Sequence, residues 1–170
     1  MKKLMIASAI AMTMTAGSAM ASQGDVKFFG NVSAVTCDVT PSIDGNVTDL
    51  VQLGTVAPGG EGDAKDIIFK ATNVSGGDCA SLTDKTASIA WTGELTPNGI
   101  GAQGGTAQDA YVILTPANGK DSNPINASHN VSTFAASKLA TEGLQFTAKL
   151  KGGTTPGDFQ TAAAYAVTYQ

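Results

Sequence analysis

Short runs of strand-forming residues, separated by turn residues, constrain the fold of this chain more than any other feature. The runs are rich in β-branched and aromatic side chains, and helix signals are scarce. The breaks contain residues that favour turns, as in Pro97-Asn98-Gly99 and Gly152-Gly153. This pattern is typical of an all-β sandwich. We predict strands over residues 25–38, 49–56, 65–72, 86–95, 110–116, 144–151 and 159–169.

The stretch 117–141 does not follow this pattern, because it is long and polar. We expect a surface loop there. It would hold either a short extra strand near residues 131–134 or one turn of helix near residues 135–139. Long loops on a rigid sandwich often carry recognition. Trp91, within a predicted strand, is expected to face the core, with an exposed sugar-binding role as the alternative.

The N-terminus has the three parts of a secretory signal. Lys2 and Lys3 precede an apolar stretch over residues 4–16, and Ala19-Met20-Ala21 matches the small-x-small cleavage pattern. Cleavage after Ala21 would leave 149 residues (170 minus 21). The apolar stretch is shorter than the roughly 20 residues that span a bilayer. We therefore expect an exported, soluble protein with one domain.

Charge argues against nucleic acid as a partner. Loss of the two signal lysines would leave 8 lysines and no arginine against 14 acidic residues, a net charge of −6 (8 minus 14). Binding to phosphates needs a basic surface, and the sequence has no basic stripe.

Cys37 and Cys79 are the only cysteines in the chain. Export to an oxidising compartment favours a disulfide between them. A metal site would need two further ligands, and the lone His129 cannot complete one at any recognised spacing. No cofactor is expected.

Two patterns that suggest catalysis are better explained without it. Residues 99-GIGAQG-104 match the GxGxxG dinucleotide fingerprint, which works only where a strand feeds a helix. Here Pro97-Asn98 precedes the glycines and no amphipathic helix follows, so the segment is predicted to be a hairpin loop. A Ser-His-Asp set would depend on His129 alone, within a polar loop. We expect no enzymatic activity.

Both ends of the predicted mature chain alternate apolar and other residues with the period of a strand. If it folded alone, the last strand would be an exposed edge with a partly bare apolar face, which is an aggregation hazard. The first strand is the obvious cover, from the same molecule or from another. The apolar rows are Val26, Phe28, Gly30, Val32 and Ala34 at the N-terminus and Ala163, Tyr165, Val167 and Tyr169 at the C-terminus.

Four further features make these ends specific. Tyr169 is the penultimate residue, Gly157 is fourteenth from the end, Gly30 interrupts the N-terminal row, and Cys37 follows that row. In these features the chain resembles the pilin subunits of chaperone-usher fimbriae. It looks most like the major subunits of the adhesive fimbriae of enterotoxin-producing enteric bacteria. The segments 50-LVQLG-54, 77-GDC-79 and 87-ASIAWTG-93 also resemble that group.

The resemblance implies an incomplete immunoglobulin-like sandwich that lacks its last strand. Residues 1–21 would be the signal peptide, residues 22–34 a donor strand for a neighbouring subunit, and residues 35–170 the pilin domain. A periplasmic chaperone would first supply the missing strand, and an outer-membrane usher would then assemble identical subunits head to tail into a fimbria at the cell surface. The groove edge and chaperone contact would comprise Gly157, Ala163, Tyr165, Val167 and Tyr169.

The main hypothesis is therefore a structural fimbrial subunit that mediates attachment to host tissue. Because shaft subunits of the closest group also bind host glycans, Lys120 and Lys138 in the 117–141 loop are candidate glycan ligands. The alternatives are a monomeric secreted carbohydrate-binding module, whose first strand would pair within its own chain, and an enzyme that uses the glycine motif.

Overall fold

The computed structural model describes residues 37–43, 45–72, 79 and 81–170. The predicted signal peptide (1–21) and donor strand (22–34) lie outside these residues. Within the described part of the chain, no helix is long and apolar enough to cross a membrane.

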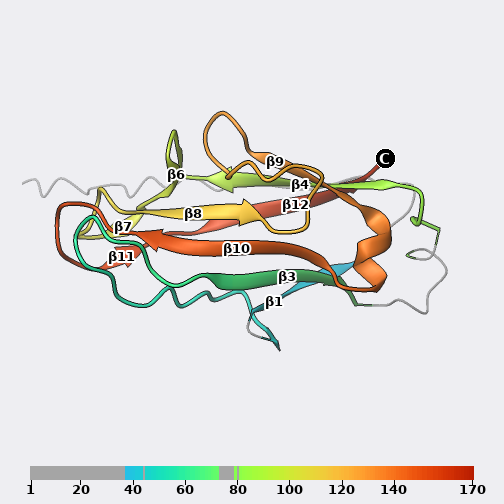
Figure 1. Ribbon diagram of the computed structural model, residues 1–170, viewed down its shortest axis with the longest axis horizontal. Helices are drawn as coiled ribbons and strands as arrows, with labels where there is room; N and C mark the ends of the chain where they lie inside the picture. The colour runs from blue at the N-terminus through green and yellow to red at the C-terminus, as the bar shows by residue number, and fades with distance from the viewer. Residues whose placement is uncertain (1–36, 44, 73–78, 80) are drawn as a thin grey trace, which may run out of the picture.

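Two main antiparallel sheets and a separate two-stranded pair form the described part of the molecule, and the strands of the main sheets run along its long axis (Figure 1). The larger sheet has the strand order β2-β1-β3-β10-β8-β6-β5. Its strands are β1 (Val39–Ile43), β2 (Asn46–Val47), β3 (Lys65–Ala71), β5 (Leu95–Thr96), β6 (Gly99–Gly101), β8 (Tyr111–Pro116) and β10 (Leu144–Lys151). The architecture is an immunoglobulin-like sandwich, which confirms the predicted all-β class.

The smaller sheet has the order β12-β4-β9, and β12 is its terminal strand among the described residues. Its strands are β4 (Thr86–Gly93), β9 (Val131–Ala135) and β12 (Ala163–Tyr169). A separate pair joins β7 (Gly104–Gly105) to β11 (Phe159–Gln160). The 3-10 helix η1 (Ala136–Ala140) lies at the end of the sandwich where the chain terminates, and the β7–β11 pair lies at the opposite end (Figure 1).

Aromatic side chains fill the core between the two sheets. Alternate residues of β10, including Leu144 and Phe146, are fully buried because successive strand residues face opposite sides. Trp91 of β4 is only 5% exposed, and its ring lies edge-on to Phe146 with centroids 5.4 Å apart. The prediction that Trp91 faces the core is therefore correct.

The predicted strands 65–72, 86–95, 110–116 and 144–151 match β3, β4, β8 and β10, whereas the short strands β2, β6 and β7 were not predicted. Three further segments differ. Strand β1 was not predicted. It contains Pro41, a residue that is tolerated at sheet edges, and at Pro41 the strand pairs with β3 alone. The prediction over 159–169 becomes two strands, β11 and β12, in different sheets. The predicted strand 49–56 is wrong, since no described strand pairs with it.

Residues 99–104 form short strands, and the stretch 117–141 forms one strand and a short helix. The glycine-rich motif contributes to β6 and β7; β6 forms a hairpin with β5, and the strand β8 follows. The motif therefore lacks the strand-to-helix context that dinucleotide binding requires. The long polar stretch contains both of the elements considered for it, the strand β9 and the helix η1.

Candidate strand-binding groove

Strand β12 presents a row of apolar side chains that are only half-buried. Ala163, Tyr165, Val167 and Tyr169 pack against the main core but stay partly exposed. They lie directly opposite the β4 row in the sheet, with Tyr165 facing Trp91 and Val167 facing Ile89. The β4 row is buried because β4 has a strand on each side, whereas β12 ends the described sheet. The smaller sheet thus ends in an incompletely covered apolar edge.

Tyr165 connects this edge to both sheets. Its ring centroid lies 4.7 Å from that of Phe69 on β3 and 5.8 Å from that of Trp91 on β4. Desolvation by burial raises the pKa of its phenol above the usual value. The tyrosine ring therefore occupies the space between the two sheets at the middle of β12.

The opposite wall of the groove is the segment 50–58, most of which falls within the predicted strand 49–56. Val51 and Leu53 pack against the main core, and Val56 packs against a second cluster that contains Ala107, Ala110 and Leu150. Backbone groups of residues 51–56 form no hydrogen bond with any other described residue. A segment whose main-chain groups lack partners can pair with an added strand.

A cavity of about 940 Å³ opens between this wall and the segment that leads into β12. Its lining includes Leu53, Val56 and Pro58 on one side and residues 155–161 on the other, with Ala107, Ala110 and Leu150 also contributing. The lining ends at Thr161, two residues before the half-buried row of β12 begins. We call this cavity the mouth of the groove.

Gly157 lies in the wall of the mouth, and its backbone has a conformation that favours glycine. Its φ is 156°, and a Cβ atom there would overlap the side chain of Thr106. The glycine that the sequence singled out therefore permits close packing of the 152–158 segment against the segment around Thr106.

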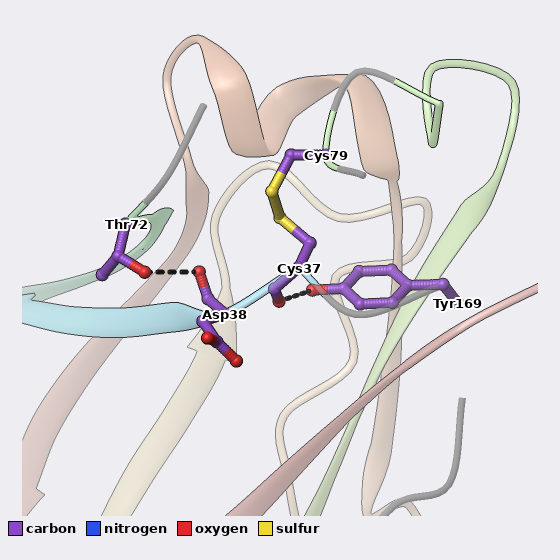
Figure 2. Close-up of a disulfide and its surroundings, with 5 residues drawn as sticks. All are labelled: Cys37, Asp38, Thr72, Cys79 and Tyr169. Atoms are coloured by element: carbon purple, nitrogen blue, oxygen red, sulfur yellow. Dashed lines mark hydrogen bonds between the residues drawn. A yellow bond between two sulfur atoms is a disulfide. The ribbon is translucent and has the colours of Figure 1, made fainter. Parts of the chain in front are cut away.

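At its other end, β12 is fixed to the place where the described chain begins. The phenol of Tyr169 donates a hydrogen bond of 2.8 Å to the carbonyl oxygen of Cys37, and Cys37 forms a disulfide with Cys79 (Figure 2). Desolvation by burial, with a contribution from the charge of Asp38, raises the pKa of Tyr169 to about 12. The carbonyl of Asp38 in turn accepts a hydrogen bond of 3.0 Å from the Thr72 hydroxyl (Figure 2). The predicted disulfide is thus present.

The two lysines considered for glycan binding lie close in structure. The Lys138 ammonium donates to the carbonyl oxygen of Asn118 at 2.9 Å and pairs with Glu142 at 3.2 Å. Lys120, two residues from Asn118, donates to the Thr86 hydroxyl at 2.6 Å. Both ammonium groups therefore have partners within the chain, and the Lys138 contact ties η1 to the loop that carries Lys120.

His129 makes contacts within its own loop. Its Nε2 lies 3.3 Å from a carboxylate oxygen of Asp121, and its backbone N–H donates to the Asn126 side chain at 2.9 Å. Among the described residues, no three histidine, cysteine or acidic side chains are grouped so as to hold a metal ion.

Sequence comparisons find relatives over the whole chain. It is 58% identical to the F107 fimbrial protein of Escherichia coli, with complete coverage of both proteins. It is 31% identical to the major MR/P fimbria protein of Proteus mirabilis (100% of this chain, 99% of that one) and 30% identical to the K99 fimbrial protein of Escherichia coli (99% of each). No protein-family model matches the chain. The crystal structure of the P pilus rod subunit PapA aligns with 87% of this chain and all of its own, with 19% identity and a TM-score of 0.49.

Proposed function

This chain belongs to the family of fimbrial subunit proteins, and we propose that it polymerises by donating residues 22–34 to the groove of a neighbouring copy. It is a structural subunit of a chaperone-usher fimbria at the bacterial surface, and its family is not enzymatic. The donor strand, the chaperone that would occupy the groove before assembly, and the usher that would exchange the two are parts of the proposal.

The observation that carries the proposal is that each wall of the groove is incomplete: one lacks apolar cover and the other lacks main-chain partners. One wall is the half-buried apolar row of β12, and the other is the segment 51–56, which has no main-chain partners among the described residues. An added strand would cover the row and pair with the backbone of the opposite wall. The alternating row Val26, Phe28, Gly30 and Val32 has the period that such a strand needs.

The position of Cys37 favours one direction for the donor. Cys37 contacts Tyr169, so in each subunit the N-terminal segment joins the domain at the C-terminal end of β12. If an incoming donor ran parallel to β12, its own domain would have to sit at that same end, where the recipient's segment leaves. An antiparallel donor places the incoming domain at the mouth instead. The recipient's donor then remains free for the next subunit.

The same geometry distinguishes exchange from self-insertion. A segment that ran back from Cys37 into its own groove would lie parallel to β12, and parallel pairing is slightly less stable per residue. The alternative of a monomeric carbohydrate-binding module requires that arrangement. Exchange between copies gives antiparallel pairing and a heterologous contact that does not close, which produces an open filament.

The donor has enough apolar side chains to bind strongly. Full burial of Val26, Phe28 and Val32 would each contribute about 1.5–3 kcal/mol. In the antiparallel direction, Val32 and Ala34 would reach the mouth, while Val26 would lie toward Tyr169. The main-chain hydrogen bonds along both walls would add to this.

Electrophoresis of surface fibres without boiling tests the proposed function. We expect a ladder of detergent-resistant multimers that collapses to the subunit after boiling, because each junction buries a complete strand. A sample that runs as monomer before boiling, from cells with visible fibres, would contradict donor exchange. It would leave family membership intact.

We also propose that the surface around Asn118, flanked by Lys120 and Lys138, binds host glycans. The contact between Lys138 and the Asn118 carbonyl supports this, because it brings two of the lysines of a net acidic chain to one surface. Lys120→Gln with Lys138→Gln should weaken fimbrial binding to immobilised host glycans by about tenfold or more, as expected for lost hydrogen bonds to charged groups. Lys149→Gln, on β10, is the matched control. Unchanged binding with normal fibres would remove the proposal.

A further inference from the structure

Three loops are joined by hydrogen bonds around the mouth of the groove. The N–H of Gly59 donates to the Gly153 carbonyl at 2.8 Å, and the N–H of Gly152 donates to the Gly60 carbonyl at 2.9 Å. The N–H of Ala107 donates to the Asp158 carbonyl at 3.1 Å. The segment 152–158 is therefore held on both sides, and several of its residues line the mouth.

The Asp109 carboxylate fastens the middle of this segment. It accepts hydrogen bonds from the Thr154 N–H at 2.5 Å and the Thr154 hydroxyl at 2.6 Å, and a longer one from the Thr155 N–H at 3.4 Å. These bonds, that of the Thr154 side chain first, lower the pKa of Asp109. A Cβ atom at Gly153 would overlap the carboxylate, so the segment lies directly against it.

Asp109 does not line the mouth itself. Its neighbours Ala107 and Ala110 do, and so do Gly153, Thr155 and Gly157 of the segment that it fastens. Any effect of the carboxylate on a strand in the groove must therefore pass through the position of the 152–157 segment.

We propose that Asp109 is a positioning residue for subunit assembly, which holds the 152–157 wall so that the mouth receives the C-terminal part of the donor, Val32 and Ala34. This inference rests on the proposed donor exchange. In this role, an exposed acidic side chain outside the lining of the mouth controls how fast the last part of the donor enters it.

The test uses the mature subunit in complex with its periplasmic chaperone and fluorescent peptides of residues 22–34 and 22–30, with anisotropy as the readout of peptide capture. Only the longer peptide reaches the mouth. We expect Asp109→Ala to slow capture of the longer peptide about tenfold and to leave capture of the shorter one unchanged. Asp109→Asn, which keeps an acceptor oxygen, should recover most of the rate. Asp84→Asn, which removes the same charge at an exposed position outside the lining of the mouth, should behave as wild type.

The outcomes separate the two proposals. If wild type captures neither peptide, donor exchange itself fails. If Asp109→Ala captures the longer peptide as fast as wild type, exchange stands and the role of Asp109 is refuted. Equal slowing of both peptides would indicate a general defect and would also refute positioning. Should Asp109→Ala yield no complex, Thr154→Ala, which removes one of the hydrogen bonds, is expected to show an intermediate slowing of the longer peptide alone.

Discussion

Gly30→Leu should abolish the detergent-resistant multimers while leaving the subunit able to form its chaperone complex. In the proposed arrangement, residue 30 lies at the middle of the donor, and the Tyr165 ring already fills the space between the sheets at the middle of β12. A leucine there has no room, and overpacking costs about 1–3 kcal/mol or more. Each junction would weaken by roughly 10- to 100-fold, and the loss repeats at every junction of a fibre.

Asn31→Leu is the matched control for this variant. It adds a leucine to the neighbouring residue, which faces the other side of the donor because strand side chains alternate. Fibres from Asn31→Leu should be normal on unboiled gels, and both variants should co-purify with the chaperone through the groove of their own domain. Normal fibres from Gly30→Leu would contradict the proposed role of the donor.

Removal of the disulfide should cost the subunit about 4 kcal/mol of stability. The bond joins Cys37 to Cys79 over a sequence separation of 42, and the lost chain-entropy restraint for such a loop is worth about 4 kcal/mol. For a domain of this size the transition should fall by roughly 10–15 °C. Thermal unfolding of the purified subunit with Cys37→Ala and Cys79→Ala, followed by circular dichroism, measures the change.

Reduced wild-type protein distinguishes the effect of losing the crosslink on stability from the effect of replacing the two side chains. If the crosslink is responsible, the reduced protein and the double variant should unfold at similar temperatures, both well below the oxidised protein. A double variant as stable as the oxidised protein would show that the Tyr169 hydrogen bond and the packing of this end suffice without the covalent bond.

Local sequence patterns predicted the strands that lie in the middle of the sheets. β3, β4, β8 and β10 have alternating or β-branched residues throughout, and their predicted bounds agree with the structure within two residues. Trp91 was assigned to the core because it sits in such a run. These elements were predictable because the residues that define them are adjacent in sequence.

The groove was only half predictable. The β12 row follows from its alternation, but the segment 49–56, which was also predicted as a strand, pairs with no described strand. Whether a predicted strand finds a neighbour depends on distant parts of the chain, which a local pattern does not contain. Asp109 gave no signal at all, because its partners lie 45 and 46 positions later in the sequence.

The disulfide next to Tyr169 also decides how tension would travel along a fibre. In the proposed filament, a pull on one subunit through its N-terminal residues arrives at Cys37. The covalent bond transmits this pull to Cys79, so the stretch 38–78, with β1, β2 and β3, is bypassed. From Cys79 the chain continues to β4, the neighbour of the β12 strand that would grip the next subunit. Stretching such a fibre would therefore load the junctions between subunits without unfolding the first third of each domain.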